Sequence, residues 1–200
     1  MRTLSWGFRK AQIWLDELPT WDFHTLEVVE QSRDASNSRN YKEKKCAIEL
    51  YAPIGAIAYY GALGVTFTPQ GRGRITVQVP ISEDNGPLLD ASLAGKTDEV
   101  HIGLPQEYAE NILDVFLNAD SVQQLGAGTL RICSGAHGTI GSSPWFFGAL
   151  SRILTKLLLL EDTSASDESL IDFIRKELIQ KGPSTNDVIT NLGVQMNQIR

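Results

Sequence analysis

The sequence contains little cysteine and no long apolar run. Its two cysteines, Cys46 and Cys133, form no Cys-x-x-Cys pair, so neither a disulfide framework nor a zinc site is expected, and both thiols should be reduced. No apolar run approaches the roughly 20 residues of a membrane span. Charges and tryptophans interrupt the N-terminal segment, which therefore does not resemble a signal peptide. We expect a cytoplasmic protein.

Positive charge is also scarce. The 200 residues carry a net charge of −6, which argues against a general nucleic-acid binder and against an anionic-membrane binder. Residues 83–120 contain nine acidic side chains and a single basic one, Lys96. Residues 121–160 contain Arg131, Arg152 and Lys156 and no acid. One end of the molecule should therefore differ electrically from the other.

Hydrophobic periodicity predicts strands first and helices later. Strands are expected over 24–31, within 46–69, over 74–82 with Ile75, Val77 and Val79 on one face, over 88–95 and over 126–135. Helices are expected over 105–118, 144–160 and 164–181. These elements divide the chain into an N-terminal extension with a strand and a polar loop (1–45), a core domain (46–160), a C-terminal helix packed on the core (161–183) and a tail (184–200).

The stretch "CSGAHGTIGSSPWFF" (133–147) combines residue types found in active sites and anion cradles. Its Cys and His lack an acidic residue nearby to orient the histidine, so no catalytic residue is assigned. Glycines before a helix N-terminus can present backbone N–H groups to an anion. The same residues also suit a plain helix start, with a capping serine and Pro144 in the first turn. Both interpretations remain open from the sequence.

Four segments in order resemble domain IV of the ribosomal translocase elongation factor G. They are "QGRGRITVQVPIS", "GPLLDASLAG", "GLPQEYAENILDVF", in which Gln106 replaces a lysine, and "GTLRICSGAHGTIGSSPWFFGALSRIL". The resemblance covers residues 70–160. It implies an α+β two-layer sandwich, in which a mostly antiparallel sheet has helices on one face and a left-handed βαβ crossover. It also implies that the loop with His137 lies at the tip of the domain and contacts the small ribosomal subunit.

"GTIGSSPWFFGAL" (138–150) is similar to a second family with this fold, the galactokinase, homoserine kinase and mevalonate kinase group. In that group a Gly-Leu-Gly-Ser-Ser loop holds ATP phosphates on its backbone N–H groups. The resemblance implies a cradle for a nucleotide or phosphometabolite at residues 138–143. Pro144 removes one of the N–H groups on which such a cradle depends.

The sequence thus predicts a non-catalytic binding module that contacts the ribosome or structured RNA through residues 134–143. The alternatives are nucleotide or phosphometabolite binding at Gly138–Ser143 and a protein-protein interaction scaffold. No cofactor, metal, membrane or general DNA contact is expected, and the oligomeric state stays open. The candidate binding residues are Arg131, Gly135, His137, Gly138, Thr139, Gly141, Ser142 and Ser143.

Overall fold

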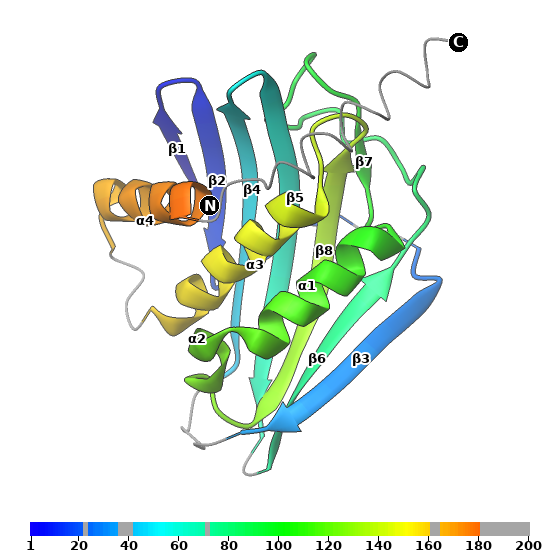
Figure 1. Ribbon diagram of the computed structural model, residues 1–200, viewed down its shortest axis with the longest axis vertical. Coiled ribbons are helices and arrows are strands. Elements are labelled where there is room, and N and C mark those ends of the chain that lie inside the picture. Colours follow the sequence, from blue (N-terminus) through cyan, green and yellow to red (C-terminus); the bar gives the residue numbers. More distant parts are fainter. Residues whose placement is uncertain (22–23, 36–41, 71–72, 161–164, 181–200) are drawn as a thin grey trace.

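The chain forms one large sheet with helices on one of its faces (Figure 1). The structure is a computed structural model that describes residues 1–21, 24–35, 42–70, 73–160 and 165–180. The elements are β1 (Arg2–Trp6), β2 (Arg9–Leu15), β3 (Glu27–Asp34), β4 (Lys44–Ile54), β5 (Ile57–Pro69), β6 (Arg74–Ile81), β7 (Val100–Ile102), α1 (Gln106–Asn118), α2 (Asp120–Gln123), β8 (Gly128–Gly138), α3 (Pro144–Leu159) and α4 (Asp167–Gln180). This mixed arrangement agrees with the predicted α+β class.

The strands do not follow chain order across the sheet. Their order is β1-β2-β4-β5-β8-β6-β3, and the short β7 pairs with the last residues of β8. The pairings are antiparallel except that β6 and β8 run parallel. Parallel neighbours require a crossover connection. Here the chain returns from β6 to β8 through α1 and α2 on the helix-covered face.

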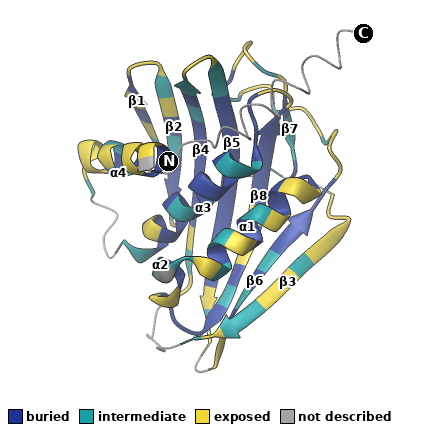
Figure 2. Cartoon of the chain, viewed as in Figure 1, coloured by how far each residue is buried: buried dark blue, intermediate teal, exposed yellow. Residues whose placement is uncertain are grey.

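The main hydrophobic core lies between the helices and the sheet. α1 buries one stripe that includes Tyr108, Ile112 and Phe116, whereas α3 is buried on most of its sides. The start of α3 confirms the helix-start interpretation, because Ser143 caps the helix by accepting a hydrogen bond from the Phe146 N–H and Pro144 occupies the first turn. Figure 2 shows how much more of α3 than of α4 is buried.

A smaller apolar cluster lies on the opposite face of the sheet, near one end. It joins Tyr60 and Ala136 from the sheet with Ala94 and Val100 from the chain that follows β6. Glu49 fastens this covering chain, because its carboxylate accepts hydrogen bonds from the Leu93 N–H (2.7 Å) and the Tyr60 hydroxyl (2.9 Å). The 82–99 segment is thereby held against the face that the helices leave uncovered.

The N-terminal region contributes more to the sheet than predicted. One strand is expected in residues 1–45, whereas β1, β2 and β3 all come from the described part of this region. β2 pairs with β4 near one edge, and β3 pairs with β6 at the other. β1 and β2 do alternate, with Leu4 and Trp6 of β1 and Ala11 and Ile13 of β2 buried, but each alternation spans only about four residues and was not recognised as a strand signal. The predicted tail (184–200) lies outside the described residues.

Two further boundaries differ from the predictions. Residues 88–95 form turns instead of a strand, apart from an isolated bridge between Leu88 and His101. β8 continues to Gly138 instead of ending near Gly135, because β7 supplies a pairing partner for its last residues. The pairing partner of a strand end is a property of the tertiary fold, so the local pattern could not reveal it. The predicted helices and the inward face of β6, with Ile75, Val77 and Val79, are confirmed.

Candidate functional site

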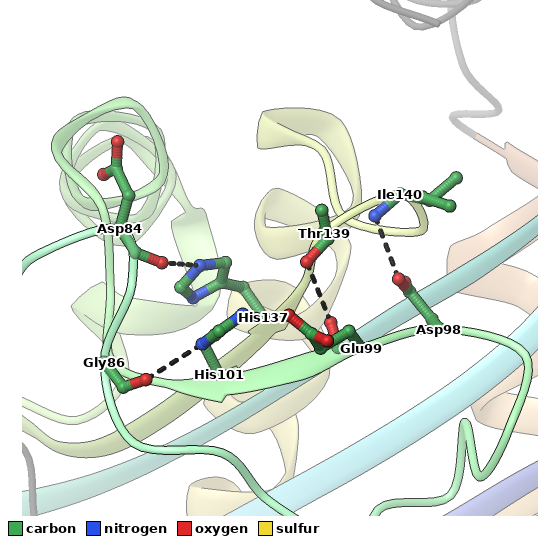
Figure 3. Close-up of polar contacts among 8 residues, drawn as sticks. All are labelled: Asp84, Gly86, Asp98, Glu99, His101, His137, Thr139 and Ile140. Atoms are coloured by element: carbon green, nitrogen blue, oxygen red, sulfur yellow. Dashed lines mark hydrogen bonds and ion pairs between the residues drawn. The ribbon is translucent and has the colours of Figure 1, made fainter. Parts of the chain in front are cut away.

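Seven of the eight predicted binding residues lie near the end of β8 and in the turn that leads into α3. Figure 3 shows two of them, His137 and Thr139, with their neighbours. His137 and Gly138 are the last two residues of β8, and Thr139, Gly141, Ser142 and Ser143 lie in the turn. Only Thr139 and Ile140 in this turn are exposed. Of the predicted contact region 134–143, only the tip of the turn is therefore accessible, because residues 134–138 are buried strand.

The backbone N–H groups of the turn already hold an anion that belongs to the chain itself. One oxygen of the Asp98 carboxylate accepts from the Ile140 N–H (3.0 Å), and the other accepts from the Gly141 N–H (2.7 Å). The Gly138 N–H donates to the Ser142 hydroxyl, which in turn donates to the Tyr60 carbonyl (both 2.8 Å). The cradle predicted from the glycines and serines is thus occupied by Asp98.

The glycines of this region are explained by close approach. A Cβ on Gly138 would run into the Asp98 carboxylate, and a Cβ on Gly141 would run into the Ala58 carbonyl. Gly135 lies earlier on β8, where the Leu104 side chain fills the space beside its Cα. Gly138 and Gly141 require glycine because a carboxylate and a backbone carbonyl pack directly against them. Their spacing therefore reflects packing within the chain.

His137 stacks on a second histidine that the sequence did not single out. Its ring lies 6.0 Å from the His101 ring, between β7 and the start of α1, where the Tyr108 ring is 5.8 Å away. The two ring nitrogens of His137 face the carbonyl oxygens of Gly103 (3.1 Å) and Asp84 (2.9 Å). In Figure 3 the Asp84 carboxylate points away from the ring. His137 thereby ties the 82–104 chain to the end of β8.

The protonation of His137 follows from its surroundings. Its side chain is 5% exposed, and this burial lowers the pKa of the imidazole, although the bonds to the Gly103 and Asp84 carbonyls act in the opposite direction. A neutral imidazole has one N–H, so it can donate to only one of these two oxygens at a time. His137 is therefore a buried structural residue whose ring hydrogen-bonds to the backbone of the 82–104 chain. The expectation that His137 contacts a partner directly is not supported by this position.

A pocket of about 450 Å³ opens beside the turn. Residues of the 88–100 segment line the pocket, together with Ile140 of the turn. Three acidic residues, Asp90, Asp98 and Glu99, line this acid-lined pocket together with the base Lys96. Among the described residues, neither Asp90 nor Asp98 forms an ion pair. The acidic side chains of the pocket therefore outnumber its basic ones, three to one.

Arg131 does not belong to this site. It lies in the middle of β8, between Thr66 of β5 and Gln78 of β6, and its side chain is exposed on the face without helices. Cys133 is exposed on the same strand, whereas Cys46 is buried. The structure thus keeps seven of the predicted residues together and separates Arg131 from them.

Sequence reasoning missed the residues that complete the site. Asp98, Glu99 and His101 lie some forty residues before the turn, and they reach it only because β7 pairs with the end of β8. The acidic bias of residues 83–120 marks the stretch that contains Asp98 and Glu99. The expected separation of this stretch from residues 121–160 is not found at the site, because Asp98 and Glu99 lie against the 139–141 turn. The pairing that brings the segment to the turn has no local signature.

Comparison of the chain with protein-family models, with curated proteins and with solved structures finds no match. Within the described residues, no helix has the length and apolar character needed to cross a membrane, and no group of three or more His, Cys, Asp or Glu side chains could hold a metal ion. The function must therefore be argued from the geometry and chemistry of the site itself.

Proposed function

We propose that this protein is a non-catalytic binding module for another protein. Its contact surface is the turn end of the sheet, which we define as the β1–β2 turn (7–8), the β4–β5 turn (55–56), the tip of the 139–143 turn and the 82–99 segment. Figure 1 draws the turns of this group along its upper edge. Of the partners that the sequence left open for a binding module, we therefore choose a protein.

The observation that carries the proposal is the exposure of large apolar side chains on three separate parts of the turn end. Phe8 is 86% exposed, Ile140 is 56% exposed and Leu88 is 55% exposed. Turns are normally polar, because their backbone faces water. Apolar residues gathered at one end of a molecule are typical of protein-protein contact surfaces.

The charge of the turn end favours a protein over RNA. Glu83, Asp84 and Glu99 are exposed there, and Asp98 holds the turn. RNA phosphates would be repelled by this acidic surface. The N–H groups that a nucleotide phosphate would need are engaged by Asp98 and Ser142. Neither the RNA contact nor the nucleotide cradle therefore receives support from this geometry.

We also propose the finer fold assignment, that of elongation factor G domain IV with its left-handed crossover. The parallel pair β6 and β8, joined through α1 and flanked by antiparallel β5 and β3, supports it. In Figure 1 the helices lie in front of the sheet, and the chain passes from β6 leftward to β8. With the helices toward the viewer and both strands pointing up, a leftward step is the left-handed sense, which is rare.

Site-specific photo-cross-linking in cells that produce the protein tests the proposed function. A photoreactive phenylalanine analogue is placed at Phe8, Leu88 or Ile140, and in a control at Ile179, which is 75% exposed on α4. We expect one protein to be cross-linked from the three turn-end positions and not from position 179. In binding assays with that purified protein, Phe8→Ser and Ile140→Ser should each weaken affinity roughly tenfold, and Ile179→Ser should not.

Two results would overturn the proposal. Cross-links to ribosomal or other RNA from the turn end would favour the RNA contact predicted from sequence. Equal cross-linking from position 179 and from the turn end would show that the turn end is not a specific contact surface.

A further inference from the structure

The acid-lined pocket combines carboxylates and apolar side chains in one lining. It is open to solvent, and its volume of about 450 Å³ is larger than one side chain requires. Leu88 and Ile140, both more than half exposed, contribute the apolar part of its lining. Lysine and arginine bury their methylene stems against such apolar groups while their charged ends stay in polar surroundings.

One carboxylate of the pocket, that of Asp98, is held in place by the protein itself. Asp98 is fixed by the two N–H groups of the turn, one on each oxygen. Each carboxylate oxygen has a second lone pair, so Asp98 can still accept a hydrogen bond from a ligand. Asp90 lines the same pocket and forms no ion pair among the described residues. Asp98 thus offers a fixed acceptor to the pocket and Asp90 a carboxylate outside any ion pair, and carboxylate acceptors suit a donor that carries positive charge.

The lining of the pocket is more acidic than basic. Asp90, Asp98 and Glu99 line it, against the single base Lys96. Lys96 is exposed. Because like charges repel, Lys96 should oppose a cationic ligand, and removing its charge should strengthen binding.

From these observations we propose that the acid-lined pocket receives a lysine or arginine side chain of the partner, with apolar neighbours of that side chain resting on Leu88 and Ile140. This inference rests on the proposed function, because it names the chemistry of the partner that the turn end would bind. The occupant is a basic segment with apolar residues on both sides of the cation.

The test uses two matched peptides, Ac-Leu-Arg-Leu-NH2 and Ac-Leu-Gln-Leu-NH2, titrated into the isotope-labelled full chain. We expect the arginine peptide to shift the backbone amide signals of Asp98, Ile140 and Gly141 in a saturable way. Its affinity should be at least tenfold higher than that of the glutamine peptide and should fall as salt rises, since the contact is electrostatic.

Three variants make the test specific to the pocket. Asp90→Asn should weaken binding of the arginine peptide by about three- to tenfold, and Lys96→Gln should strengthen it by a similar factor. Asp114→Asn serves as the control, because Asp114 is also an exposed aspartate but lies on α1, where it accepts a hydrogen bond from the Asn118 amide. None of the three side chains is buried, so the amide spectra should confirm an intact fold.

The inference is overturned if the two peptides bind equally, if pocket signals do not shift up to about 10 mM peptide, or if Asp114→Asn has the same effect as Asp90→Asn. Its failure can be told from that of the proposed function. If a cross-linked partner bound with the same affinity to Asp90→Asn, to Lys96→Gln and to the unchanged protein, the protein-binding function would stand. The assignment of a cationic side chain to the acid-lined pocket would then be wrong. If the arginine peptide bound the pocket but no protein were cross-linked at the turn end, the pocket assignment would stand and the proposed function would be wrong.

Discussion

The helix-covered face and the turn end of this protein are stabilised by opposite means. Between the helices and the sheet, large apolar side chains such as Phe116, Phe146 and Leu150 are fully buried. At the turn end, buried or half-buried polar groups tie segments together: Asp98 holds the turn, His137 holds the 82–104 chain and Glu49 holds Leu93. The first region gains stability from burying apolar area, and the second obtains its shape from directed hydrogen bonds.

This difference has a functional consequence. A region shaped by hydrogen bonds to backbone can leave apolar side chains such as Ile140 pointing outward without losing its structure, because those side chains do not hold it together. On the helix-covered face the apolar side chains must stay buried, because their burial is what stabilises that region. The same contrast predicts how each region responds to substitution.

The largest effect is expected in the helix-covered core. Leu154→Asp places a carboxylate at a fully buried position of α3, within the apolar core. We expect a loss of about 4 kcal/mol or more in the free energy of unfolding, a large part of the roughly 5–15 kcal/mol that stabilises a typical domain. Urea unfolding measures it. Ile179→Asp, at an exposed position of α4, is the control and should change stability by less than about 0.5 kcal/mol.

A smaller and local effect is expected at the turn end. Asp98→Ala removes the acceptor of the Ile140 and Gly141 N–H groups, which should cost about 1–3 kcal/mol. Because the core is untouched, the chain should remain folded, and amide hydrogen exchange should speed up in the 139–143 turn. Asp98→Asn keeps one acceptor oxygen and should lose less. Unchanged exchange in the turn of Asp98→Ala would contradict the role given to this carboxylate.

The smallest effect concerns the charge of Glu49 and depends on pH. Burial raises the pKa of this carboxyl, although bonds from the Leu93 N–H and the Tyr60 hydroxyl counteract the rise. The folded state therefore binds this proton more tightly than the unfolded state, so its contribution to stability falls as pH rises through the window above the ordinary glutamate pKa. Glu49→Gln, which keeps an acceptor and removes the charge, should be more stable than the natural chain by about 1 kcal/mol at neutral pH.

Chemical denaturation over about pH 4 to pH 8 measures this difference. The advantage of Glu49→Gln should shrink toward the acid end, where Glu49 is protonated in both states. Glu27→Gln, at an exposed position of β3, should show no such trend. A difference between Glu49→Gln and the natural chain that stays constant with pH would contradict a raised pKa at Glu49.

Much of the fold and part of the site could be predicted from local sequence. The helix over 144–160 follows from a capping serine, Pro144 and an apolar run, and the structure places α3 there. The inward face of β6 follows from the alternation of Ile75, Val77 and Val79. The helix-start interpretation of the cradle-like turn is also confirmed. The carboxylate that binds the N–H groups of this turn could not be predicted, because Asp98 and Ile140 are forty-two residues apart in the sequence.

The sequence by itself therefore determined the elements whose signals are local: the helices, the inward strand faces and the acidic character of residues 83–120. Only the tertiary structure decided which segments meet. Pairing of β7 with β8 brings Asp98, Glu99 and His101 to the turn. His137, which the family resemblance placed in a contact loop, is buried there. The physical reason is range: caps and periodicity act over a few residues, whereas strand pairing joins residues across the whole chain.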